Sequence, residues 1–152
     1  MEKAPIVSQG ERRHLTILFT DLTGYTRLME QYDPEDVQAL MGTITTSCIE
    51  IIKAYNGHIE RVIGDEVLAL FGLPVTHEDD AIRAIKAARD IHATVAGLKL
   101  SSLPPDEPFA MHTGINTGLV VTARTTPTDG SFDLSGDAVN LASRLSDIAR
   151  PN

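Results

Sequence analysis

The sequence lacks the features of a membrane-spanning or disulfide-bonded protein, and it is poor in positive charge. Cys48 is the one cysteine among 152 residues, so no disulfide framework can form within the chain, and we expect a reducing, cytoplasmic compartment. No apolar stretch is long enough to span a bilayer and no charged-then-apolar leader is present, so we expect no membrane contact by this domain. The formal net charge of −8 excludes the concentrated positive field that nucleic acids require. Any phosphate must therefore be held locally, by metal ions, backbone or single side chains.

The composition is that of a globular domain. Hydrophobic residues make up 42% of the chain and charged residues 22%, which suits one domain with a sizeable core. Residues 1–10 show little periodicity and are expected to form a leader or linker, so that the domain occupies residues 11–152. Cys48 falls on a helical apolar stripe, which favours a buried structural thiol over a nucleophile.

Hydrophobic periodicity predicts alternating strands and helices. The expected elements are a strand over 14–21, a helix over 34–55 with Asp33 as N-cap, strands over 58–63 and 66–71, a helix over 77–98 opened by a capping box at Thr76 and Asp79, strands over 109–117 and 119–123 separated by Gly118, and a helix over 138–149. This order predicts an α+β domain with a ferredoxin-like βαββαβ core, a mostly antiparallel sheet and helices packed on one face.

Two aspartates at predicted strand ends are candidate metal ligands. Asp21 ends the first strand before a Gly-containing turn, and Asp65 lies at the tip of a hairpin. Taken alone, Asp21 is also typical of a helix N-cap, and Asp65 is typical of a turn. If the two strands are neighbours, however, the carboxylates repel each other unless a cation lies between them. Mg²⁺ uses one or two carboxylates together with substrate phosphates, so a nucleotide would complete the site.

A second candidate pair lies on the last predicted helix. Asn140 and Arg144 are spaced i, i+4 and therefore share one helix face. An amide beside a guanidinium suits a ribose oxygen and a phosphate, although a solvated helix face gives the same pattern.

Four stretches together resemble the class III adenylyl/guanylyl cyclase catalytic domain, of bacterial type. They are Leu18–Leu28, Asn56–Gly72, Thr113–Gly118 and Phe132–Leu145, in the order and spacing of that family. The resemblance implies metal binding by Asp21, Leu22 and Asp65, and substrate binding by Thr23, Gly24, Tyr25 and Thr26 in the turn. It further implies that Arg61 and Asp133 read the base, and that Asn140 and Arg144 orient the ribose and stabilise the transition state.

The resemblance also implies a reaction, cofactors and partners. An adenylate cyclase would convert ATP into 3′,5′-cyclic AMP and pyrophosphate with two Mg²⁺ or Mn²⁺ ions per site. The site would form across a head-to-tail homodimer, with metal aspartates from one subunit and base-reading and transition-state residues from the other. We expect the domain to be fused to other signalling domains in a longer protein.

Three departures from the family leave a non-catalytic reading open. Arg61 replaces a lysine that usually reads the base, and His112 replaces an arginine that many members have near the phosphates. The chain stops at Pro151–Asn152, where family domains continue with further strands. The alternative is a dimerising or nucleotide-sensing cyclase-like module. A diguanylate cyclase is disfavoured, because Ile63 interrupts its Gly-Gly-Asp-Glu hairpin motif.

Overall fold

A central antiparallel sheet organises the domain. The computed structural model describes residues 11–99, 108–124 and 132–151. Its sheet has the strand order β2-β3-β1-β4-β5, and each neighbouring pair is antiparallel. The strands are β1 (Glu11–Leu22), β2 (His58–Ile63), β3 (Glu66–Phe71), β4 (Met111–Arg124) and β5 (Phe132–Ser135). The predicted α+β, ferredoxin-like class is confirmed, and β5 adds a short strand at one edge.

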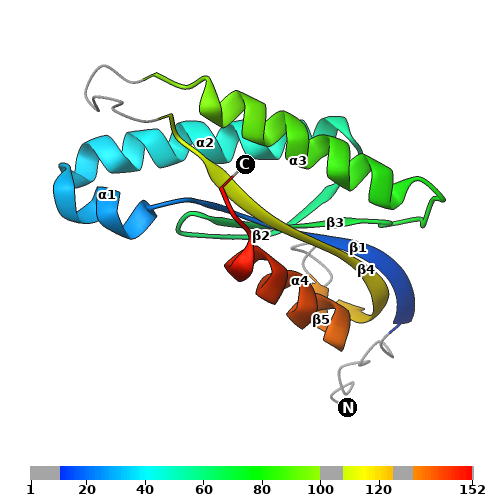
Figure 1. Ribbon diagram of the computed structural model, residues 1–152. Helices are drawn as coiled ribbons and strands as arrows, with labels where there is room; N and C mark the ends of the chain where they lie inside the picture. The colour runs from blue at the N-terminus through cyan, green and yellow to red at the C-terminus, as the bar shows by residue number, and fades with distance from the viewer. Residues whose placement is uncertain (1–10, 100–107, 125–131, 152) are drawn as a thin grey trace, which may run out of the picture.

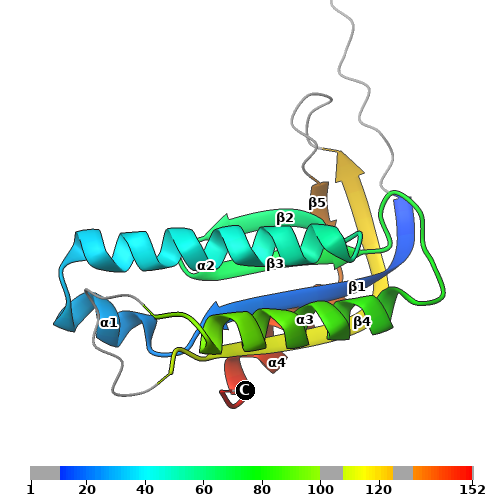
Figure 2. The same ribbon diagram turned by 90° about the horizontal axis from the view of Figure 1, so that it is seen from above.

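Helices cover both faces of this sheet, as Figures 1 and 2 show. The helices are α1 (Tyr25–Gln31), α2 (Pro34–Ala54), α3 (Asp80–Ala96) and α4 (Asp137–Ile148). The expectation that helices pack on one face holds for α2 and α3, whereas α4 lies on the other. The reason is that β1 is apolar on both sides. Leu18 and Leu22 belong to the core beneath α2 and α3, and Ile17 and Phe19 belong to a second core shared with α4.

Strand β4 continues through a glycine that we expected to interrupt it. Two strands separated by Gly118 were predicted, but Met111–Arg124 forms one strand in which Gly118 pairs with Leu15. A Cβ atom on Gly118 would lie 2.7 Å from the Cβ of Ala138 in α4. The glycine therefore serves close helix–sheet packing rather than a turn, a distinction that the local sequence does not contain.

Helix α2 supplies much of the core beneath the sheet. It begins at Pro34 and ends at Ala54, close to the predicted bounds, and Asn56 beyond it has a positive φ of 59°. Cys48 is fully buried, and burial raises the pKa of its thiol to about 11. The thiol thus stays protonated at neutral pH, as a structural cysteine should. In the described part of the chain, no helix is long and apolar enough to cross a membrane.

Gly114 is expected to be essential for seating α4. A Cβ atom there would overlap the backbone of Ala142 and Ser146 in α4. Gly114→Ala should therefore destabilise the domain by about 3 kcal/mol through overpacking, as measured by urea unfolding. Gly42→Ala is the matched control. Gly42 is exposed in α2 with open space around it, so alanine should stabilise the domain by about 0.5–1 kcal/mol. Equal stabilities of the two variants would contradict the close packing of α4.

Candidate functional site

The end of β1 brings Asp21 against a histidine from β4. Asp21 and His112 are direct partners in the antiparallel register, so their side chains point to the same face of the sheet. His112 Nε2 lies 3.3 Å from Asp21 Oδ2, and its other ring nitrogen, Nδ1, lies 3.2 Å from Thr23 Oγ1. Both side chains are largely buried, with 16% of Asp21 and 22% of His112 exposed.

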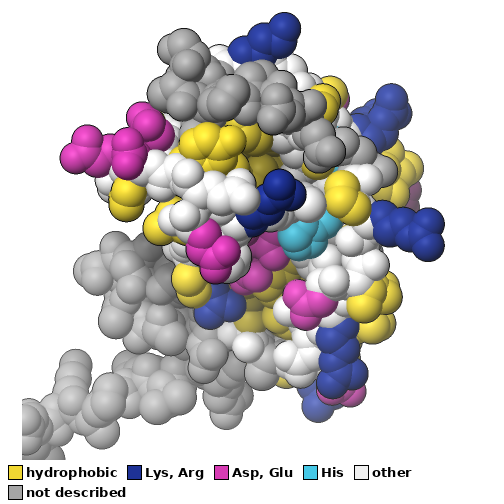
Figure 3. Space-filling view, turned by 60° about the vertical axis from the view of Figure 1, so that its left-hand side comes forward, with side chains coloured by type: hydrophobic (Ala, Val, Ile, Leu, Met, Phe, Trp, Pro, Cys, Tyr) yellow, Lys and Arg dark blue, Asp and Glu magenta, His cyan; other side chains and the backbone are white. Residues whose placement is uncertain are grey.

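The β2–β3 hairpin delivers Asp65 to the same end of the sheet. Gly64 and Asp65 form a two-residue turn between Ile63 and Glu66, and Gly64 adopts a left-handed φ of 57°. Because β3 pairs with β1 up to Thr20 and Val67, this turn lies beside the last residues of β1. Figure 3 shows acidic side chains gathered beside a histidine on this end of the molecule. The structure therefore brings the two predicted metal ligands together.

Burial raises the cost of ionising both carboxylates, and nearby negative charge adds to that cost for Asp21. The pKa of Asp21 is raised from 3.8 to about 6, first by burial and then by the charges of Asp65 and Glu66, while His112 opposes the shift. Burial also raises the pKa of Asp65, against hydrogen bonds with backbone groups, including that of Leu22. Partly buried carboxylates that repel one another are a donor set suited to a hard divalent cation.

The described residues fit a metal site that is only partly supplied by protein side chains. They contain no cluster of three or more His, Cys, Asp or Glu side chains able to hold a metal ion. The side chain of Leu22 is buried in the core, so Leu22 could contribute only its backbone carbonyl. Magnesium commonly keeps one or two carboxylates and takes its other ligands from water and substrate oxygens. Asp21 and Asp65 match this preference of magnesium for few protein carboxylates.

The turn after β1 is fixed by backbone contacts. Thr23 N–H donates to the carbonyl of Ala110 at 2.8 Å, and Gly24 is the N-cap of α1 in a left-handed conformation with φ 75°. Tyr25 packs partly against the core, whereas Thr26 is exposed. All four predicted substrate-binding residues of this turn thus lie just after Asp21, the aspartate predicted to bind metal, and its neighbour Leu22.

A β-bulge directs Arg61 to the face that carries Asp21. Ile59 pairs with Ala69 and packs on the α2–α3 core, whereas Arg61 pairs with Leu68, which belongs to the core on the α4 side. The register shift between Ile59 and Arg61 makes this possible, since residues two apart in a regular strand share a face. Arg61 is exposed there. Sequence reasoning placed Arg61 in the site without identifying the bulge.

The other predicted residues do not meet the aspartates within one chain. Asn140 and Arg144 are both exposed on α4. Among the described residues, neither side chain forms a hydrogen bond or ion pair with Asp21 or Asp65. Asp133 lies in β5, where its backbone pairs with Ala123 of β4, but its side chain is not among those that the structure describes. Within one chain, the predicted metal ligands and the predicted ribose- and phosphate-facing residues of α4 therefore make no hydrogen bond or ion pair with each other among the described side chains.

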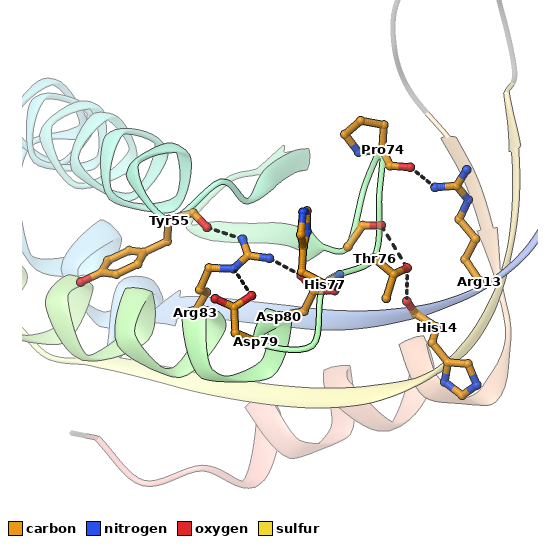
Figure 4. A network of polar contacts seen from close by, with 10 residues as sticks. Arg13, His14, Tyr55, Pro74, Thr76, His77, Asp79, Asp80 and Arg83 are labelled. Atoms are coloured by element: carbon orange, nitrogen blue, oxygen red, sulfur yellow. Dashed lines mark hydrogen bonds and ion pairs between the residues drawn. The ribbon is translucent and has the colours of Figure 1, made fainter.

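A second polar network at the opposite end of β1 is structural. Figure 4 shows Arg83 reaching Asp79 and Asp80 and the carbonyl of Tyr55, which joins the start of α3 to the end of α2. The predicted capping box at Thr76 is wrong. The N-cap of α3 is Asp79, and the Thr76 hydroxyl donates instead to the carbonyls of His14 and Gly72. That tertiary contact outcompetes the local cap.

Comparisons with known proteins identify the family. The model of the adenylate and guanylate cyclase catalytic domain matches residues 7–152, so the chain belongs to this family and is a cyclase catalytic domain of the adenylyl/guanylyl type. The chain is 31% identical over 139 residues to adenylate cyclase 1 of Rhizobium meliloti, covering 88% of this chain and 20% of that protein. It is 32% identical over 139 residues to the receptor-type guanylate cyclase gcy-7 of Caenorhabditis elegans, covering 90% and 12%.

A solved cyclase domain shares the fold. The guanylyl cyclase domain of the RhoGC fusion protein from the aquatic fungus Blastocladiella emersonii, solved in a dimeric form, superposes with a TM-score of 0.82 at 25% identity, over 95% of this chain and 79% of that chain. This chain spans no more than a fifth of the two curated relatives. The relatives include adenylate, guanylate and cytidylate cyclases, so family membership alone leaves the base of the nucleotide open.

Asp21→Asn should stabilise the metal-free domain at pH 8 but not at pH 4. The folded-state pKa of about 6 lies above the ordinary 3.8, so ionisation of Asp21 costs folding free energy as the pH rises through this window. We expect the free energy of unfolding at pH 8, measured with urea and EDTA, to rise by about 1 kcal/mol. Partial contact of Asp21 with water keeps this gain below the full value that the pKa shift implies. Mn²⁺ should reverse the order by stabilising the wild type. Equal stabilities at pH 8 would contradict this account.

Proposed function

We propose that the domain is an adenylate cyclase that converts ATP into 3′,5′-cyclic AMP and pyrophosphate. The observation that carries the proposal is the pair of partly buried carboxylates, Asp21 and Asp65, at one end of the sheet. Burial and mutual repulsion make these groups costly unless a cation joins them. Two Mg²⁺ or Mn²⁺ ions bound there would neutralise the triphosphate and lower the pKa of the ribose 3′ hydroxyl.

The protein residues around the carboxylates have complementary tasks in this proposal. Asp21 and Asp65 hold the ions, with the carbonyl of Leu22 as a further oxygen donor. The turn from Thr23 to Thr26 faces the phosphates, where the first backbone N–H groups of α1 favour negative charge. Asn140 orients the ribose, and Arg144 offers a fixed fork of donors to the charge that develops on the α-phosphate.

The separation of these groups in one chain supports a shared site in a head-to-tail homodimer. The exposed Asn140 and Arg144 need a partner's aspartates to complete the reaction centre, and the reciprocal contact would create a second, equivalent site. The RhoGC cyclase domain was solved as a non-canonical dimer, which supports association of such domains, and the head-to-tail arrangement is our proposal. We further propose that the domain is fused to other signalling domains, since the matched relatives are several times longer. We also propose cytoplasmic residence, because Cys48 is the one cysteine of the chain.

We propose ATP as substrate because Asp133 is an acceptor suited to the exocyclic amine of adenine. Arg61 shares the Asp21 face and can donate to a ring nitrogen of the purine. Turnover measured with Mn²⁺ should therefore be faster with ATP than with GTP. Arg61→Glu should lower the ATP-to-GTP ratio of kcat/KM by about tenfold, because it removes one hydrogen bond to the base. Arg61→Lys is the matched control and should keep the preference.

Turnover should be measured on this chain and on its natural full-length form. Failure of the full-length protein to form any cyclic nucleotide would favour the alternative, a non-catalytic dimerising or nucleotide-sensing module. Efficient GTP turnover with little ATP turnover would instead retain the cyclase and overturn the assigned purine.

Mixing two inactive variants should restore activity if the site is shared. Asp21→Ala removes a metal ligand and Arg144→Ala removes the transition-state cation, so each homodimer should lose activity by at least about 100-fold. A mixed dimer keeps one intact site, because both lesions fall in the other. An equimolar mixture should therefore recover roughly a quarter of the wild-type rate if subunits exchange at random. Absence of recovery, with subunit exchange verified by labelled protomers, would contradict the composite site.

A further inference from the structure

We infer that His112 is a positioning residue that aligns the metal ligand Asp21 with the phosphate-facing turn; this inference rests on the proposed metal site. The imidazole contacts Asp21 through one ring nitrogen and Thr23 through the other, at 3.3 and 3.2 Å. It therefore joins the last segment of β1 to the turn that follows it.

The contact with Asp21 fixes the proton on one ring nitrogen. An ionised Asp21 carboxylate can only accept a hydrogen bond, so His112 Nε2 must carry the proton that faces Asp21 Oδ2. The Thr23 hydroxyl can either donate to Nδ1 or accept from it, so the second contact is satisfied with or without a proton on that nitrogen.

The bridge stands on a rigid support. His112 is paired with Asp21 across β1 and β4, and the Thr23 N–H donates to Ala110, two residues before His112. Thr23 is thus held to the same segment of chain through its backbone and its side chain. Asp21 Oδ1 makes no hydrogen bond among the described residues, so engagement of Oδ2 by His112 leaves one carboxylate oxygen available to a cation.

This arrangement separates metal capture from direct phosphate binding. A partner that orients a ligating carboxylate commonly contributes tenfold or more to metal affinity. Residue 112 would therefore act on how well the site holds its ions rather than as a cation for the triphosphate. The expected signature is a higher metal requirement with little change in kcat once metal is saturating.

The test measures the affinity for Mn²⁺ in the absence of nucleotide, with the free ion quantified by electron paramagnetic resonance. His112→Phe keeps a planar ring but removes both contacts, and it should weaken Mn²⁺ binding about tenfold. Thr23→Val removes one contact and should weaken binding in the same direction, whereas Thr23→Ser should bind like the wild type. The double variant His112→Phe with Thr23→Val should bind no more weakly than His112→Phe alone, because the bridge is already lost. His14→Asn, an exposed position on β1, is the unaffected control.

The outcomes are distinguishable from failure of the metal site itself. Asp21→Asn should abolish tight Mn²⁺ binding, and if it binds like the wild type, the proposed metal site is wrong. If Asp21→Asn loses Mn²⁺ while His112→Phe binds as tightly as the wild type or more tightly, only the positioning role is overturned. Should His112→Phe fail to fold in a thermal unfolding check, the Thr23→Val and Thr23→Ser comparison decides the inference, with equal affinities counting against it.

Discussion

The pairing of β1 between β3 and β4 is the constraint on which the rest of the domain depends. β1 pairs with β4 along its whole length, from Glu11 with Thr122 to Leu22 with Met111, and with β3 near its end. This register places Asp21 opposite His112 and beside the hairpin turn that holds Asp65. A slip of one residue would turn Asp21 to the opposite face of the sheet and Leu18 out of its core. Burial of both faces of β1 makes that slip costly, so the core fixes the site.

Two-sided burial also explains why Asn140 and Arg144 do not join the aspartates within one subunit. Helices α2 and α3 occupy one face of the sheet, and α4 covers only part of the other, where the aspartates lie. The inner side of α4 packs tightly against Gly114 and Gly118, and its outer side leaves Asn140 and Arg144 exposed. The family to which the chain belongs acts on nucleotides, and an exposed amide and guanidinium are suited to a ligand that lies between two copies.

The charges of Asp21 and Asp65, which the proposed function needs, reduce the stability of the metal-free domain. Burial raises the pKa values of Asp21 and Asp65, and the charges of Asp65 and Glu66 raise that of Asp21 further, so ionisation of these groups destabilises the metal-free fold. His112 offsets part of that repulsion while holding Thr23 in place. The proposed cation would offset this cost, so the domain would be more stable with the ion bound.

The sequence by itself determined the long elements and the chemistry of the motifs, but it predicted neither α1 nor β5 and divided β4 in two. Periodicity located the long strands and helices because burial acts locally on faces of fixed period, and residue types singled out Asp21 and Asp65 as candidate metal ligands. Only the tertiary structure decided that α4 covers the second face, that a bulge directs Arg61, that Thr76 bonds His14 rather than α3, and that His112 bridges Asp21 and Thr23. Each of these depends on strand register or helix docking, which joins residues far apart in the chain, and no local pattern encodes such a contact.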